Sequence, residues 1–430
     1  MQKLKISLED LFFAYFSCRQ NKRRTINALD FELDYEAKLI KLYNDIRSRK
    51  YKIGKSIAFI VFEPVKREVF AANFRDRVVH HYIIDRINSY FEKDFIADSY
   101  SCREGKGTLY GVKRVYEKIY DCSLGYTKDC YILKLDIRSF FMNIDKDILF
   151  KKLKTFLDKR YKKPDKSTII YLIKKVIFNN PEDNCIIKGK ISDWNGLPYY
   201  KSLFWSNKRN GLPIGNLTSQ IFANFYLNFL DKYITQDLGI KYYGRYVDDF
   251  VIIHEDKEYL KKVHKKIENF LRKELKLTIH PQKVYLQHYS KGVKFIGAVI
   301  KPNRIYIGKR TKSGLYKKIH SKLYKMSQDI KIFLEEIPNF ESGINSYFGF
   351  MRHYNTYNLR YQTISNLQKT YISPIIKDKN EYNKLSIDKI FKPLEQKKHQ
   401  LRRQRQYRRW QYNNKKGENR NGNIHTTTDI

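Results

Sequence analysis

The sequence predicts an α+β fold, because short apolar runs typical of strands alternate with patterns typical of amphipathic helices. Residues 131–136 form a nearly continuous apolar run that ends in a carboxylate, as expected of a strand buried on both faces. Two further strand-like runs, 242–247 and 250–253, are separated only by Asp248 and Asp249. That spacing is typical of a hairpin, and Asp tolerates the unusual backbone angles of such a turn.

The other elements follow from hydrophobic spacing and from breaker residues. Helices are predicted from Ser7, which acts as a cap, and over about 35–49, 76–91, 216–233 and 257–275; strands are predicted over 56–62, 291–300 and 304–307. Asn216 is expected to cap the helix that it opens. Residues 180–213 are rich in Gly, Asn, Asp and Pro and predict a long connection. Residues 312–367 are helical, with breaks expected at Pro338 and Gly343.

The composition points to a polyanionic partner. The 430 residues carry 85 Lys and Arg against 45 Asp and Glu, a formal charge of +40. Nucleic acid is the favoured partner because Lys and Arg release counterions from phosphates; an anionic membrane surface is the competing one. No run approaches the length of a spanning helix and no signal peptide is evident, so no membrane is expected. Five scattered cysteines fit a reducing cytoplasm.

Three carboxylates are the strongest candidates for chemistry: Asp136 at a strand end, with Asp248 and Asp249 at a hairpin tip. Two hard divalent ions held by such oxygens can bind both the attacking and the leaving oxygen of a phosphoryl transfer. This requires the two strands to be neighbours in one sheet. An ordinary acidic turn is the alternative interpretation of Asp248 and Asp249 taken alone.

These segments resemble blocks of a known family. The stretch Tyr246 to Phe250 resembles the Y-x-D-D hairpin of reverse transcriptases, Leu135 to Phe141 their first catalytic block, and Pro213 to Gln220 the block that supports the template and the incoming base. The resemblance covers about 62–307 and implies a right-hand polymerase fold. The expected domains are N-terminal helices and fingers over 1–130, a palm over 131–310 with an interleaved segment at about 155–212, a helical thumb over 311–375, and a basic, partly disordered tail over 376–430.

The resemblance also implies the roles of the catalytic residues. Asp136 and Asp248 would be the principal metal ligands, with the carbonyl of Ile137 nearby and Asp249 as the third carboxylate. The cofactor would be two Mg²⁺ ions, for which Mn²⁺ substitutes. The ring of Phe141 would lie against the sugar and reject a 2′-hydroxyl; core packing is the alternative interpretation for Phe141.

Further residues are assigned to substrates through the same resemblance. Those implied in dNTP binding, besides Phe141, are Lys66, Arg67, Ile214, Gly215, Gln220 and Lys283, and those implied in gripping the primer end are Phe295, Ile296 and Gly297. Basic side chains suit a triphosphate, and a Lys can protonate departing pyrophosphate. A solvated surface position is the alternative for Lys66 and Arg67, and for Lys283 it weighs at least equally.

One departure from the family pattern narrows the predicted type of reverse transcriptase. Most reverse transcriptases have Gln and Pro where this chain has Ile214 and Gln220, and the substituted block resembles that of diversity-generating retroelements. That resemblance implies an error-prone enzyme that copies a template-repeat RNA for mutagenic retrohoming, in a bacterium or phage, with a small basic accessory protein. An anti-phage defence enzyme and a non-catalytic RNA-binding protein are the alternatives. The basic segment Gln396 to Arg409, with Tyr407 and Trp410, either clamps RNA or is a solubilising tail.

Overall fold

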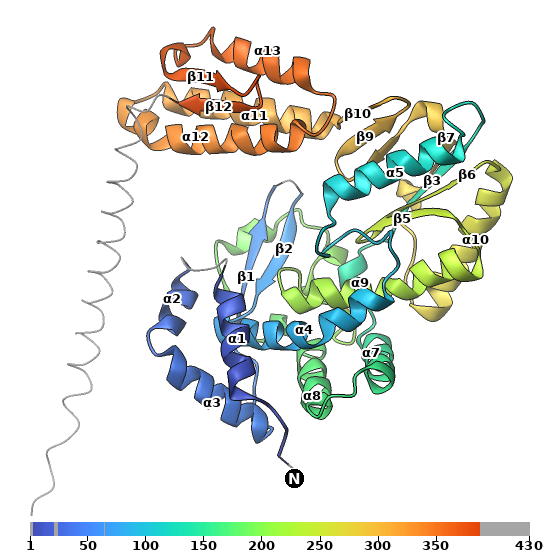
Figure 1. Cartoon of the computed structure of the whole chain (residues 1–430). Coiled ribbons are helices and arrows are strands. Elements are labelled where there is room, and N and C mark those ends of the chain that lie inside the picture. The colour runs from blue at the N-terminus through green and yellow to red at the C-terminus, as the bar shows by residue number, and fades with distance from the viewer. Residues whose placement is uncertain (1–2, 21–24, 64, 388–430) are drawn as a thin grey trace, which may run out of the picture. The chain divides into compact units, whose positions relative to one another are not determined.

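The chain folds into two compact units, residues 1–296 and 297–430. The computed structural model describes residues 3–20, 25–63 and 65–387 (Figure 1). Among the helices of these residues, none has both the length and the apolar character to cross a bilayer. The basic segment from Gln396 to Arg409, with Tyr407 and Trp410, lies outside the described residues.

The first unit opens with a group of helices. They are α1 (Leu8–Arg19), α2 (Ile26–Glu32), α3 (Tyr35–Arg47) and α4 (Phe74–Asp94). The amide of Asp10 donates to the hydroxyl of Ser7 at 3.2 Å, which confirms the predicted cap of α1. Helix α4 packs against both α1 and α9 (Leu217–Lys232), so it ties the N-terminal helices to the rest of the unit.

A small sheet follows, with β1 (Ser56–Val61) between β2 (Arg67–Ala71) and β4 (Cys185–Ile187). Strand β4 belongs to the predicted long connection, which otherwise consists of 3-10 turns: η1 (Pro181–Asp183), η2 (Ile191–Trp194), η3 (Tyr199–Lys201) and η4 (Leu203–Trp205). Buried Glu68 of β2 anchors this connection. Its carboxylate accepts from the Trp194 indole at 2.7 Å, the Ser202 hydroxyl at 2.6 Å and the Leu203 amide at 2.7 Å.

The central sheet has four antiparallel strands in the order β5 (Tyr242–Tyr246), β6 (Asp249–His254), β3 (Tyr131–Asp136) and β7 (Tyr285–His288). Helix α5 (Thr108–Cys122) packs on β5 and β6, and α10 (Lys257–Glu274) packs on β3 and β6 (Figure 1). Helices α6 (Phe140–Asn143), α7 (Lys146–Arg160) and α8 (Lys166–Ile177) follow β3. This covering explains why the middle strands read as continuous apolar runs.

Two local predictions are wrong. Asn216 is the residue before α9, but its side chain makes no cap hydrogen bond. It accepts instead from the amide of Ala72 at 3.1 Å, because the loop that carries it lies against the end of β2. The single strand predicted over 291–300 is divided into β8 (Val293–Phe295) and β9 (Ala298–Lys301), since Ile296 and Gly297 between them have positive φ.

The second unit is mainly helical. It contains β9, β10 (Arg304–Ile307), α11 (Lys309–Met326), α12 (Ile330–Met351), α13 (Tyr357–Leu367), β11 (Ile376–Lys379) and β12 (Lys384–Ile387). The breaks predicted at Pro338 and Gly343 do not occur, because both residues lie inside α12. A Cβ on Gly343 would come within 2.5 Å of the end of the flexible Lys318 side chain of α11, so that side chain would have to move aside. Residues 376–387, assigned above to the start of the basic tail, form the β11–β12 hairpin.

Candidate active site

The pairing of β3 with β6 brings the three carboxylates to one end of the central sheet. Asp136 is the register partner of Asp249, and the amide of Ile137 donates to the carbonyl of Asp248 at 3.2 Å. Both strands are in the interior of the sheet, so the acidic residues are placed by backbone hydrogen bonds on rigid elements. The adjacency that the chemistry requires is therefore present.

The turn between β5 and β6 differs by one residue from the predicted one. Tyr246 pairs with Asp249, so the two turn residues are Val247 and Asp248. The positive φ of the turn, 56°, falls on Val247 and not on an Asp. A β-branched residue rarely adopts this conformation, and holding it there costs on the order of 1–3 kcal/mol. The backbone beside the carboxylates is therefore strained.

The acidic groups are half-buried and repel one another. Burial, and next the charge of Asp136, raises the pKa of Asp248 to about 7. Burial raises the pKa of Asp249 to about 6, although Lys134 at 2.8 Å acts in the opposite direction. A cation placed among these groups would relieve both effects.

Lys283 lies at the same end of the sheet. Its ammonium group donates to both carboxylate oxygens of Asp136, at 2.9 and 3.0 Å. Backbone bonds place it: the amide of His280 donates to the carbonyl of Asp136 at 2.7 Å, and the amide of Lys283 donates to the carbonyl of His280 at 3.0 Å. The lysine assigned to the nucleotide is thus also in contact with the first carboxylate.

The donor set fits hard divalent cations. Asp136, Asp248 and Asp249 offer carboxylate oxygens, which Mg²⁺ prefers. Burial, and to a smaller extent the charge of Asp136, raises the pKa values of Asp248 and Asp249. In the structure, Lys283 forms an ion pair with Asp136, and Lys134 forms one with Asp249. Across the described ranges, no three His, Cys, Asp or Glu side chains are already arranged around a metal position. A metal ion would therefore compete with Lys283 for Asp136.

Sequence reasoning missed Arg245, which lies beneath the strained turn. Its guanidinium makes a bidentate pair with Asp231 of α9, with both contacts at 2.6 Å, and both side chains are at most 1 % exposed. It also donates to the carbonyl of Val247 at 2.9 Å. The Tyr243 hydroxyl donates to the same Asp231 at 2.6 Å. The available signal was a charged residue inside an otherwise apolar strand, which requires a buried partner.

The residues assigned to the sugar and base lie together at one small apolar cluster. Phe141 and Ile214 are both half-buried against a core formed by Ala58, Ile60, Phe70, Met142, Trp194, Leu197 and Leu203. The amide of Phe70 donates to the carbonyl of Ile214 at 2.9 Å, which joins the loop to β2. Gly215 has φ of 114°, and a Cβ there would lie 2.7 Å from a methyl group of Val69. Only glycine permits this close approach.

The other substrate assignments lie on more exposed surface. Lys66 donates to the carbonyl of Asn195 at 2.6 Å. Arg67 is exposed, and among the described residues its guanidinium has no ion-pair or hydrogen-bond partner. Gln220 is exposed on α9 and accepts from the thiol of Cys102 at 3.7 Å. A charged ligand could therefore reach Arg67 without displacing an internal contact.

The three primer-grip residues differ in exposure and conformation. Phe295 is fully buried, so its side chain serves the core and is not available to a primer. Ile296 is half-buried with φ of 47°, and Gly297 has φ of 81°. Any contact with nucleic acid at this turn would therefore come from its backbone or from Ile296.

The chain is similar to one family of known proteins. The model of the family "Reverse transcriptase (RNA-dependent DNA polymerase)" matches residues 66–300. No curated protein matches the chain significantly. Solved structures with a similar fold include telomerase of Candida albicans with a fragment of telomeric RNA (11% identity, 74% of this chain and 58% of that chain, TM-score 0.42) and apo telomerase of Candida tropicalis (12%, 74% and 59%, 0.44). The chain therefore spans under two thirds of the length of these proteins. With the matched region covering over half of its residues, this α+β chain with a polymerase fold belongs to the reverse transcriptase family.

Proposed function

We propose that this protein is an RNA-directed DNA polymerase that extends a primer by nucleotidyl transfer at Asp136, Asp248 and Asp249. The observation that carries the proposal is the meeting of these carboxylates with Lys283 at one sheet end. Divalent ions, when bound there, would neutralise charge on the reacting phosphate. The acidic residues hold the ions, with the carbonyl of Ile137 nearby.

The neighbouring side chains have distinct proposed tasks. Lys283 supplies a proton to the departing pyrophosphate, whose charge rises as it leaves. The ring of Phe141 leaves no room for a 2′-hydroxyl and so selects dNTPs. Lys66 and Arg67 contact the triphosphate, with Arg67 suited to a bidentate contact. Template RNA and the RNA/DNA duplex account for the large positive charge of the chain.

Primer extension on an RNA template with dNTPs and Mg²⁺ tests this proposal. We expect Asp248→Asn and Asp249→Asn to reduce extension by at least about 1,000-fold, because each removes a charge from the metal site. Glu255→Gln is the matched control, since it removes one charge from an exposed position just after β6. Absence of extension by the wild type, or equal activity of all four proteins, would favour a non-catalytic RNA-binding role.

The proposal extends to low fidelity in a diversity-generating retroelement. Ile214 supports it, because its side chain offers only an apolar surface beside Phe141, whereas a Gln could hydrogen-bond the nucleotide or template. We expect Ile214→Gln to lower misincorporation opposite template adenine, measured by sequencing the cDNA. An unchanged error spectrum would contradict this. A template repeat and a matching variable gene in the flanking DNA would separate a retroelement, with its basic accessory protein, from a phage-defence enzyme.

A further inference from the structure

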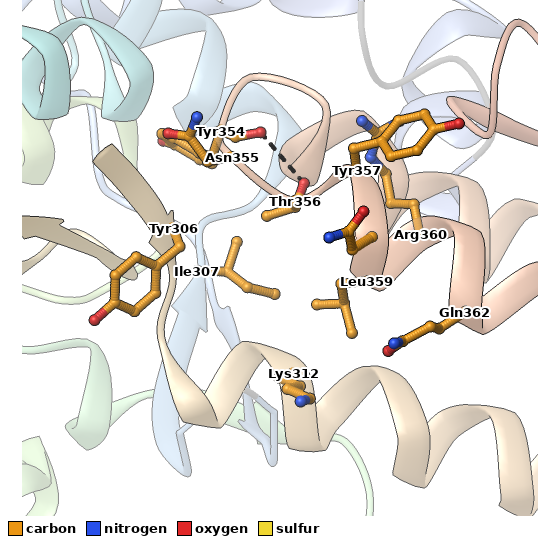
Figure 2. A pocket seen from close by; sticks show the side chains of 11 residues that line it. Tyr306, Ile307, Lys312, Tyr354, Asn355, Thr356, Tyr357, Leu359, Arg360 and Gln362 are labelled. Carbon is orange, nitrogen blue, oxygen red and sulfur yellow. Dashed lines mark hydrogen bonds between the residues drawn. The ribbon is translucent and has the colours of Figure 1, made fainter. Parts of the chain in front are cut away.

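A pocket of about 670 Å³ lies in the second unit, away from the carboxylates in sequence (Figure 2). Its walls come from the end of β10, the first turn of α11 and the segment that leads into α13. The volume is within the range of sites that hold small organic ligands. All of the lining residues belong to this one unit, so the pocket is formed by the unit itself.

The lining combines aromatic rings, amides and cations. Tyr306 and Tyr357 appear on opposite sides of the view in Figure 2, and Lys312 comes from α11 below them. Arg360 is a second cation, and no Asp or Glu lines the pocket. The lining therefore carries positive charge together with flat rings, which favours an anion that has an aromatic part.

The polar groups around the pocket differ in how accessible they are to a ligand. Within the part of the chain that the structure describes, the Tyr354 hydroxyl and the Nε of Arg360 are buried without a hydrogen-bond partner. Their residues are 8 % and 5 % exposed. Asn358 and Gln362, by contrast, are exposed, so a ligand can reach their amide groups directly. The guanidinium of Arg360 already donates to the carbonyl of Tyr382 at 3.1 Å. The accessible donors and acceptors of the pocket are therefore mainly those of the two amides.

We infer that this pocket binds a single nucleotide, with its base between or against Tyr306 and Tyr357 and its phosphate near Lys312. The amides of Asn358 and Gln362 have the donors and acceptors that read base edges. The shared chemistry is that of a nucleotide, whether free or as an unpaired residue of an RNA strand. That the nucleotide belongs to an RNA strand is inferred from the proposed function. That the pocket binds a nucleotide is inferred from its lining residues alone.

Photocrosslinking tests the site on the full chain. The probe is a 12-nucleotide single-stranded RNA that carries 4-thiouridine, and the readout is the identity and yield of crosslinked peptides. We expect a crosslink within residues 354–362, and a loss of about 5- to 100-fold in its yield at limiting protein for Tyr357→Ala, from the value of base stacking. Asn358→Ala should weaken it less.

Tyr361→Ala is the matched control. Tyr361 lies one turn further along α13, is similarly exposed (46 % against 51 % for Tyr357), and packs edge-on against the same Tyr382. It does not line the pocket. An equal loss of crosslink in both variants, or a wild-type protein without a crosslink in residues 306–312 or 354–362, would overturn the inference.

Two further experiments determine whether the bound nucleotide is free or part of an RNA strand, and distinguish this site from the polymerase site. Competition by millimolar uridine monophosphate supports binding of a free nucleotide, whereas competition only by unlabelled RNA supports an unpaired strand residue. Asp248→Asn should abolish extension and keep the crosslink in residues 354–362. A wild-type protein that lacks extension but retains this crosslink refutes only the proposed polymerase activity, and a wild-type protein that extends primers without the crosslink refutes only the pocket.

Discussion

Replacing Arg245 is the most direct test of how the fold holds the turn between β5 and β6, which consists of Val247 and Asp248. Replacing Arg245 with Met removes its charge and all of its donors but keeps a long side chain. Asp231 then remains at 0 % exposure with the Tyr243 hydroxyl as its remaining donor, and the carbonyl of Val247 loses its side-chain donor. The substitution therefore affects both the stability of the first unit and the position of the turn.

The expected magnitude follows from the burial of the pair. Removing one partner of a buried ion pair costs about 3–5 kcal/mol, so Arg245→Met should lower the free energy of unfolding by that amount. The double variant with Asp231→Asn leaves no unpaired charge, and we expect it to regain about 2 kcal/mol. Primer extension should stay low in both variants, because neither restores a donor to the carbonyl of Val247.

Urea denaturation followed by tryptophan fluorescence measures this effect. Trp194 and Trp205 lie in the first unit, so a Trp410→Phe background makes the signal specific to it. Arg209→Met is the control: its side chain is 83 % exposed, with an acidic neighbour at 3.9 Å, and such pairs contribute about 0–1 kcal/mol. A cost for Arg245→Met no larger than that of Arg209→Met would refute the reasoning. Full extension by the double variant would refute the positioning role.

Three other substitutions test the neighbourhood of the site. Gly215→Ala should lower the stability by about 1–3 kcal/mol and should also lower primer extension, because the added Cβ would meet Val69 and the φ of 114° does not suit alanine. Gly349→Ala is the control: Gly349 has open space around it, so the substitution should change neither stability nor extension. Burial raises the pKa of Glu68. The stability that this group contributes is therefore fully present below its ordinary pKa and is lost as pH rises through the raised value. Urea denaturation at several pH values should show that the Glu68→Gln variant lacks this pH dependence of stability. Phe141→Val should raise ribonucleotide incorporation by roughly 10- to 100-fold, measured with mixed rNTPs and dNTPs; unchanged selectivity would assign Phe141 to the core.

Local sequence patterns were sufficient to predict the strands that carry the candidate active site. The apolar run of β3 and the two runs of β5 and β6 were predicted to within a residue or two. These strands are buried on both faces, and burial leaves a strong apolar signal in sequence. Ser7 was identified as a cap because capping depends on the few residues that follow it.

The predictions that were wrong concern features decided by distant contacts. Asn216 has the composition of a cap, but its amide oxygen is used by Ala72, which is 144 positions earlier in the chain. Gly343 looks like a helix break, but it lies inside α12, where it faces the Lys318 side chain of α11. Propensity is a weak guide wherever packing between elements sets the outcome.

The conformation of the turn shows why the site itself was only partly predictable. The sequence favours Asp for positive φ, yet the strained residue is Val247, and Ser139 just after β3 also has a positive φ of 46°. The Arg245 guanidinium, itself held by Asp231 from α9, stabilises the carbonyl of Val247, and the pairing of β3 with β6 sets where Asp248 stands. The carboxylates are visible as residues, but their placement depends on a buried ion pair that joins a helix to a strand. Such strain persists only where surrounding contacts enforce it, and at Val247 those contacts are the Arg245 guanidinium and the pairing of β5 with β6.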